Sequence, residues 1–206
     1  TFMAKPMQRQ PGSAMHVHQS VVNLETGQNM FATAKGKDSR LFEAHVAGLQ
    51  KFMPAAMPMF APNVNSYRRL RPYSDAPINL HWGLDNRTTG LRVPPSDASA
   101  RRVENRLAGA DANPYLAIAA SLGCGYLGMT QKLTPTDQVT GSAYRLAYTL
   151  PRHQFDALSK MRQSKPVREL FGERFVNALE EVKFAEYDAY QQVISSWERE
   201  YLLLNV

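Results

Sequence analysis

Apolar and polar residues alternate over short stretches in the first half of the chain, which is the pattern of half-buried strands. Between 14 and 22, Met15 and Val17 occupy one face while polar residues occupy the other. Three further strands are expected at 78–84, 91–93 and 102–106.

Helical periodicity marks other segments. Ser39 is an N-cap signal for a helix that is expected to run to about Phe52, with Pro54 and Pro58 dividing the segment after it. The segment 114–132 is apolar nearly all round, so it predicts a buried helix. The remaining helices are expected at 151–160, 167–171 and from 175 to about 202.

Strands followed by helices are typical of an α+β fold. We therefore expect an antiparallel sheet with packed helices, with strands and pocket motifs in 1–110 and a mainly helical part in 111–206. The chain has 206 residues, of which 44% are hydrophobic, and this is enough for a single core.

Composition narrows the range of partners. The net charge of +6 raises the possibility of nucleic-acid binding, but lysines and arginines occur at most in pairs, with few interleaved aromatics, so we expect no nucleic acid. Cys124 is the only cysteine; we interpret it as a buried thiol in a reducing, cytoplasmic setting. No apolar run of about 18 residues is present, so no membrane contact is expected.

One region of the chain is rich in arginine. Eight arginines and no lysine lie between 68 and 106. Arginine is favoured over lysine where a planar fork must grip a carboxylate or phosphate. The positions that suggest a shared anion pocket are Arg69, Arg87, Arg92, Arg102 and Arg106.

A carboxylate interrupts this series at Glu104. On a strand, Arg102, Glu104 and Arg106 share one face, which is poor material for a core. The set suits an anionic substrate and a hard cation such as magnesium or manganese. A solvated ladder of ion pairs is the alternative interpretation.

Two histidines form the second chemical cluster. His16, His18 and Ser20 alternate, so a strand would place them on one face. Such a pair suits a metal ligand, a proton carrier or a phosphate donor. Exposed strand histidines without any such role are the alternative.

Taken in order, these motifs resemble the glutamine synthetase family. The resemblance covers roughly the first 120 residues, and the remainder agrees only in being helical. The segments 82–92 and 104–109 are more similar to the γ-glutamylpolyamine synthetases and glutamate–amine ligases than to the ammonia-using enzymes. The matching motifs are 12–20 after Lys5-Pro6, 65–70, 86–94, and 102–104 with 113–116.

The resemblance implies a reaction and a set of roles. ATP would phosphorylate the side-chain carboxylate of glutamate, and an organic amine would then displace the phosphate. The implied metal ligands, for Mg²⁺ or Mn²⁺, are His16 and Glu104. The implied ATP and phosphate contacts are His18, Ser20, Arg87, Arg92 and Arg102. The implied glutamate contacts are Gly12, Arg69 and Arg106, and the implied catalytic residues are Arg87 and Asp75.

The sequence departs from the family pattern in several places. Pro11 stands where the family usually has asparagine, and Ala14 where it commonly has glycine. Asp75 replaces the glutamate that ammonia-using enzymes carry on a flap, with Ser74 in place of the tyrosine before it. The shorter carboxylate leaves room for a larger amine.

The resemblance also implies ATP, glutamate and an amine as small-molecule partners, and a ring-shaped homo-oligomer of the dodecamer type. The family takes further metal-binding glutamates from upstream sequence, so we expect this chain to be a C-terminal part of a catalytic domain that is inactive alone. Two alternatives remain: a glutamine synthetase that uses ammonia, and a non-catalytic structural relative, against which the intact pocket residues argue.

Overall fold

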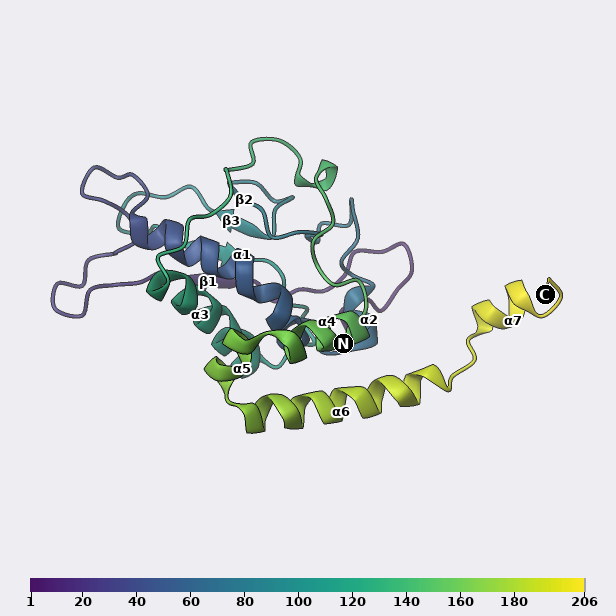
Figure 1. Cartoon of the computed structure of the whole chain (residues 1–206). Coiled ribbons are helices and arrows are strands. Elements are labelled where there is room, and N and C mark those ends of the chain that lie inside the picture. The colour runs from purple at the N-terminus through teal and green to yellow at the C-terminus, as the bar shows by residue number, and fades with distance from the viewer. Residues whose placement is uncertain (206) are drawn as a thin grey trace.

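The computed structural model describes residues 1–205 and contains one small sheet with helices packed on it (Figure 1). The strands lie in the order β1-β4-β3-β2. Their bounds are Val17–Gln19 for β1, Trp82–Leu84 for β2, Leu91–Val93 for β3 and Val103–Asn105 for β4. The predicted α+β class is confirmed.

One strand pairing departs from the predicted antiparallel sheet. β1 and β3 each pair antiparallel with β4, but β2 and β3 run parallel. Parallel neighbours normally need a long crossover. Here each strand has three residues and spans about 7 Å, so the loop 85–90 is long enough to return the chain to the start of its neighbour. The expected strand at 78–84 is regular only in its last three residues.

Helix α1, Arg40–Phe60, is the centre of the core. Ser39 caps it as predicted, accepting a hydrogen bond from the Phe42 amide at 3.1 Å. The prediction that the helix runs only to about Phe52, with Pro54 and Pro58 dividing the segment after it, is wrong, because α1 continues through both prolines to Phe60. An interior proline costs about 3 kcal/mol. Burial offsets this, since each buried apolar side chain contributes about 1.5–3 kcal/mol, and most of the second half of α1 is buried.

Helix α3, Pro114–Thr130, packs against α1 and begins at Asn113, whose side chain accepts from the Tyr115 and Leu116 amides. Gly48 and Gly128 allow the two helices to approach closely. A Cβ on Gly128 would clash with the Ala44 carbonyl oxygen. The expected complete burial of this helix is wrong, because its outer face is exposed at Tyr115, Ile118, Leu122 and Tyr126.

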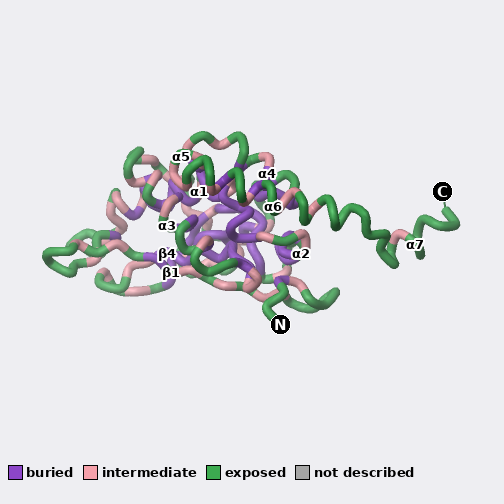
Figure 2. Tube along the Cα trace, turned by 90° about the horizontal axis from the view of Figure 1, so that it is seen from below, coloured by how far each residue is buried: buried purple, intermediate pink, exposed green. Residues whose placement is uncertain are grey.

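The C-terminal part consists of short helices and one long one. The expected helix from 175 to about 202 is interrupted at 192–195, and Ser195 caps the last helix through a reciprocal contact with Glu198. Helix α6 runs alongside α4 and α5, its C-terminal end and α7 extend from the body, and the surface of both helices is mostly exposed (Figures 1 and 2). The bounds are Val64–Tyr67 for α2, Gln154–Gln163 for α4, Lys165–Phe171 for α5, Glu173–Gln191 for α6 and Ser196–Leu202 for α7, with a 3₁₀ turn η1 at Ala143–Arg145.

The core lies between α1, α3 and one face of the sheet, and it contains the buried thiol of Cys124 as expected. Figure 2 shows this interior as a continuous buried region. Asn105 on β4 reaches into it and donates to the Ser121 hydroxyl of α3 at 2.9 Å. The opposite face of β4 is therefore left for other side chains. Among residues 1–205, no helix is both long and apolar enough to cross a lipid bilayer.

Candidate active site

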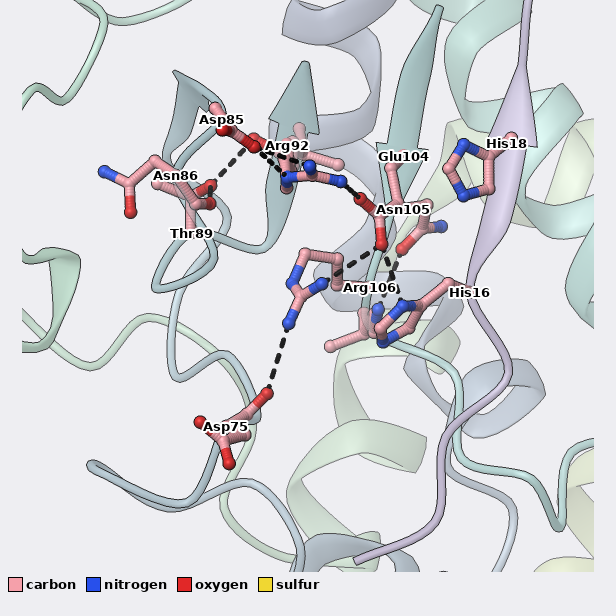
Figure 3. A network of polar contacts seen from close by, with 12 residues as sticks. His16, His18, Asp75, Asp85, Asn86, Thr89, Arg92, Glu104, Asn105 and Arg106 are labelled. Carbon is pink, nitrogen blue, oxygen red and sulfur yellow. Dashed lines mark hydrogen bonds and ion pairs between the residues drawn. The ribbon is translucent and has the colours of Figure 1, made fainter. Parts of the chain in front are cut away.

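Three strands bring their polar side chains into one row. In the sheet register, His18 of β1 and Arg92 of β3 both lie opposite Glu104 of β4. Figure 3 shows these side chains on the sheet face that points away from α3. Strand alternation predicted one shared face for His16, His18 and Ser20 and, on a second strand, another for Arg102, Glu104 and Arg106. The structure brings His16 and His18 to Glu104 and Arg102, while Ser20 lies apart.

The carboxylate of Glu104 is the centre of the cluster. Its Oε1 accepts from His16 Nδ1 at 2.8 Å and from Arg106 Nη1 at 3.0 Å, and its Oε2 accepts from Arg92 Nη1 at 2.6 Å. Glu104 is 3% exposed. Burial by itself would raise the pKa of this carboxyl, but hydrogen bonds from His16 and Arg92 and the charge of Arg106 hold the pKa well below its usual range. Glu104 is therefore ionised at neutral pH.

Arg92 is held from two sides. Its Nε and Nη2 donate to Asp85 Oδ1 at 3.0 and 2.5 Å, while Nη1 reaches Glu104 (Figure 3). The hydrogen bond to Glu104 is the main reason that the pKa of Arg92 is raised. Asp85 has a positive φ of 45° in the turn after β2. Strand alternation assigned no role to this residue, because side-chain direction in a turn does not follow the period of two.

His18 and Arg102 form one edge of the cluster. Arg102 Nε donates to His18 Nδ1 at 3.3 Å. Burial lowers the pKa of His18; Glu104 opposes the shift, whereas Arg102 adds to it. A neutral imidazole that accepts at Nδ1 carries its proton on Nε2. His18 thus has a free N–H donor directed away from Arg102.

Arg69 and Gly12 meet beside the sheet. Arg69 is 4% exposed and donates through Nη2 to the Leu107 carbonyl. Burial lowers the pKa of Arg69 to about 10. A Cβ on Gly12 would lie 2.6 Å from Arg69 Cγ, so only glycine fits against this side chain. The two predicted glutamate contacts are therefore neighbours.

Asp75 approaches the cluster through its backbone. Its carbonyl accepts from Arg106 Nη2 at 3.3 Å, and the preceding Ser74 hydroxyl donates to the Arg69 and Arg71 carbonyls. Asp75 has a φ of 59°. The Tyr144 hydroxyl lies nearby: burial raises its pKa, the charge of Asp75 adds to the rise and Arg106 opposes it. Tyr144 has no sequence motif and was not predicted.

Two predicted site residues lie apart from this network. Arg87 and Ser20 are exposed, and within residues 1–205 neither side chain forms a hydrogen bond or ion pair with the cluster. The neighbour Asn86 instead anchors the loop, donating to the Val139 and Gly141 carbonyls at 3.2 and 2.8 Å. The loop therefore presents Arg87 outward.

A buried polar network supports β1 and β4 from the core side. Asn105 donates to Ser121, and the Ser121 hydroxyl donates to the Gln19 side-chain carbonyl. These side chains come from β4, α3 and β1, so they fix the strands that carry Glu104 and His18. Nothing in the sequence indicates this network beyond the alternation that turns Asn105 away from Glu104.

The cluster provides only part of a metal site. The imidazole of His16 and the carboxylate of Glu104 are suitable donors for Mg²⁺ or Mn²⁺, but an octahedral ion takes about six ligands. Among residues 1–205, no group of three or more His, Cys, Asp or Glu side chains could hold a metal. The donor types fit such an ion, and the donor number requires ligands beyond those in the described residues.

A buried carboxylate surrounded by guanidiniums, on a small sheet with packed helices, is typical of an enzyme site for anionic substrates. The chain belongs to the glutamine synthetase family, whose profile "Glutamine synthetase, catalytic domain" matches residues 1–202.

Several relatives are similar over nearly the whole chain. Gamma-glutamylputrescine synthetase PuuA of Escherichia coli (strain K12) is 39% identical over 100% of this chain and 43% of its own length. Glutamate–isopropylamine ligase of Pseudomonas sp is 38% identical over 96% of this chain and 44% of its own. Glutamine synthetase of Methanococcus voltae is 31% identical over 96% and 46%. The chain thus spans less than half the length of these relatives.

Solved structures agree with the fold. The ligand-free structure of GmaS aligns with a TM-score of 0.87 and 30% identity, covering 98% of this chain and 48% of that one. A GmaS–ADP complex aligns with a TM-score of 0.88 and 29% identity.

Proposed function

We propose that this chain forms part of an ATP-dependent ligase that joins the side-chain carboxylate of glutamate to an organic amine through a γ-glutamyl phosphate. The observation that carries the proposal is the Glu104 carboxylate, held by His16, Arg92 and Arg106. One buried anion among several cations leaves positive charge for an incoming anionic substrate.

Phosphoryl transfer depends on positioning and on neutralising charge at the phosphate oxygens. Arg92 and Arg102 are the proposed phosphate contacts of the cluster. Each is held by a neighbour, Arg92 by Asp85 and Arg102 by His18, so little side-chain freedom is lost on binding. The Nε2–H of His18 is a third proposed donor to phosphate. Arg87 and Ser20 remain proposed ATP contacts that would have to reach the nucleotide from the exposed surface.

The proposed glutamate contacts lie on the other side of Glu104. Arg106 joins the Glu104 carboxylate to the Asp75 carbonyl. Arg69 and Gly12 lie beside Leu107. An Arg fork binds a carboxylate in two parallel hydrogen bonds. Glutamate would therefore place its α-carboxylate toward these arginines and its side-chain carboxylate, the reacting end, between Arg106 and Arg92.

His16 and Glu104 are the residues that would hold Mg²⁺ or Mn²⁺ within this chain. The metal, when bound, would neutralise charge on the transferring phosphate. Within this chain, Glu104 would supply a carboxylate oxygen and His16 a ring nitrogen to that ion.

The acceptor is proposed to be an organic amine because Asp75 is one methylene shorter than the glutamate of ammonia-using enzymes. Its backbone also has a positive φ, which aspartate tolerates better than most residues. Two relatives are named for amine substrates, putrescine and isopropylamine. Ammonia is the second candidate acceptor, since other relatives are named glutamine synthetases.

The test compares acceptors in the protein that carries this chain. With ATP, glutamate and Mg²⁺, phosphate release is measured with putrescine, spermidine, isopropylamine, methylamine and ammonia. One of the organic amines should give the highest kcat/KM. Glu104→Ala should abolish turnover with every acceptor, whereas Glu25→Ala, an exposed carboxylate in a turn, should leave it unchanged. A higher kcat/KM for ammonia than for every amine would replace the amine proposal with glutamine synthesis.

A further inference from the structure

A cavity of about 960 Å³ lies apart from the Glu104 cluster, between α2, α4, α6 and the segment 68–72. It falls within the range of pockets that hold small molecules, about 300–1,000 Å³. Its wall includes Tyr67 and Leu70, which are buried, and rings from α6. None of the predicted site residues lines it.

The cavity is cationic. Arg68, Arg71 and Arg152 line it, and no Asp or Glu among residues 1–205 does so. None of the three arginines forms an ion pair with a carboxylate in the described part of the chain. Arg92 and Arg106 of the active-site cluster, by contrast, are both paired with Glu104. Three clustered guanidiniums in a lining that contains no carboxylate among the described residues favour an anion, and Asp156 in the first turn of α4 offsets only part of their charge.

Aromatic rings hold these guanidiniums in place. Arg152 lies over the Tyr148 ring, 4.4 Å from its centroid, and Arg68 Nη2 donates to the Tyr190 hydroxyl at 3.1 Å. The Tyr148 hydroxyl donates to the Leu70 carbonyl at 2.5 Å. Burial raises the pKa of Tyr148, while the charges of Arg152 and Arg71 act against the rise, so both arginines lie close to that hydroxyl.

Two further features suit an anion here. Helix α4 starts at the cavity, and its N-cap residue His153 makes no capping hydrogen bond with its side chain. The first-turn amides of a helix attract negative charge, and Asp156 in this turn already satisfies part of that attraction. The Tyr67 hydroxyl in the buried wall has no hydrogen-bond partner among the described residues.

We propose that this cavity binds an aromatic phosphate monoester, with the dianion between Arg71 and Arg152 and the ring against Tyr187 and Tyr190. A dianion matches the excess of guanidiniums better than a single carboxylate does. The aromatic lining adds stacking and apolar contact that inorganic phosphate cannot use.

Such a ligand would act on the proposed active site through one short segment. Arg68 and Arg71 line the cavity, while Arg69 between them turns to Leu107 on the other side. Ser74 ties the carbonyls of Arg69 and Arg71 to the Asp75 loop. An occupant of the cavity would therefore restrain the backbone that carries Arg69 and Asp75.

Calorimetric titration with phenyl phosphate, inorganic phosphate and phenol tests the proposal. Phenyl phosphate should bind saturably and more tightly than either fragment. The double variant Arg71→Gln, Arg152→Gln should weaken it about tenfold or more, since it removes two charge-assisted contacts. Arg145→Gln, an exposed arginine outside the cavity, should leave the Kd unchanged.

A second variant separates ring from charge. Tyr187→Ala should raise the Kd of phenyl phosphate and leave the Kd of inorganic phosphate unchanged. This variant still tests the proposal if circular dichroism shows that the double arginine variant is unfolded. Absence of saturable binding, equal affinity for inorganic phosphate, or an equal loss in Arg145→Gln would each overturn the proposal. Loss of binding in Arg92→Gln would assign the ligand to the Glu104 cluster instead. Failure of the ligase proposal leaves all these outcomes unaffected.

Discussion

Glu104 and Asp85 are two carboxylates that share one guanidinium, that of Arg92, in different surroundings. The side chain of Glu104 is 4% exposed, whereas that of Asp85 is 57% exposed. A buried ion pair that loses one partner leaves an uncompensated charge in the interior, while an exposed pair is screened by water. The two contacts should therefore differ in energy although their distances are alike.

We expect Glu104→Gln to lower the free energy of unfolding by about 3 kcal/mol, because Arg106 is left without a counter-charge and Arg92 keeps only the exposed Asp85. Asp85→Asn should cost less than about 1 kcal/mol. Urea unfolding of the two variants at pH 7 measures both values. Similar losses of unfolding free energy in the two variants would mean that burial does not make the ion pairs of Glu104 stronger than that of Asp85.

Alternation along the sequence located the cluster but not all of its members. His16 and His18 were predicted to share a face of one strand, and Arg102, Glu104 and Arg106 a face of another, because a strand repeats every two residues. Asp85 lies in a turn and Tyr144 in a 3₁₀ segment, where that period has no meaning. Arg87 belongs to the same turn, which explains why its predicted convergence with Arg92 is not observed.

At the scale of elements, two helices have limits that differ from the prediction, one because of tertiary packing and one because of a local cap. The prolines of α1 do not end it, because the helix packs against α3 and α4 and most of its second half is buried. The predicted helix from 175 to 202 breaks at 192–195 because Ser195 and Glu198 form a capping box that starts a new helix. The sequence contains that signal in Ser195 and Glu198, but the prediction of one continuous helix from 175 to about 202 did not use it.

The contact between α1 and α3 provides a test at this scale. Gly128→Ala should destabilise the fold by about 1–3 kcal/mol, because its Cβ would meet the Ala44 carbonyl and the backbone of Gly48 rather than a movable side chain. The measurement is thermal or urea unfolding.

Gly141→Ala is the matched control. It has no neighbour within 4 Å of the added Cβ and no positive φ, so its stability should be unchanged. A Gly128→Ala variant as stable as Gly141→Ala would show that the two helices can separate without cost.

At the scale of the whole molecule, apolar surface is left uncovered in two places. The outer face of α3 exposes Tyr115 and Leu122, and α7 exposes Trp197 and Tyr201. Contiguous apolar patches of this kind mark contact surfaces. The apolar pattern of 114–132 predicted a buried helix, but the sequence of one chain does not show which surface covers its outer face.

By itself, the 206-residue chain should not turn over substrate. His16 and Glu104 are too few ligands to complete a magnesium site, and no larger acidic or histidine cluster lies among residues 1–205. Positive charge around Arg92 and Arg102 is then only partly offset, which favours binding of sulfate or phosphate over turnover. The purified chain should bind such anions, bind nucleotide weakly, self-associate through its apolar faces, and form no γ-glutamyl amide. Size-exclusion chromatography and mass spectrometry of reaction mixtures measure the last two properties. Amide synthesis by material free of any longer form would mean that these residues contain a complete site.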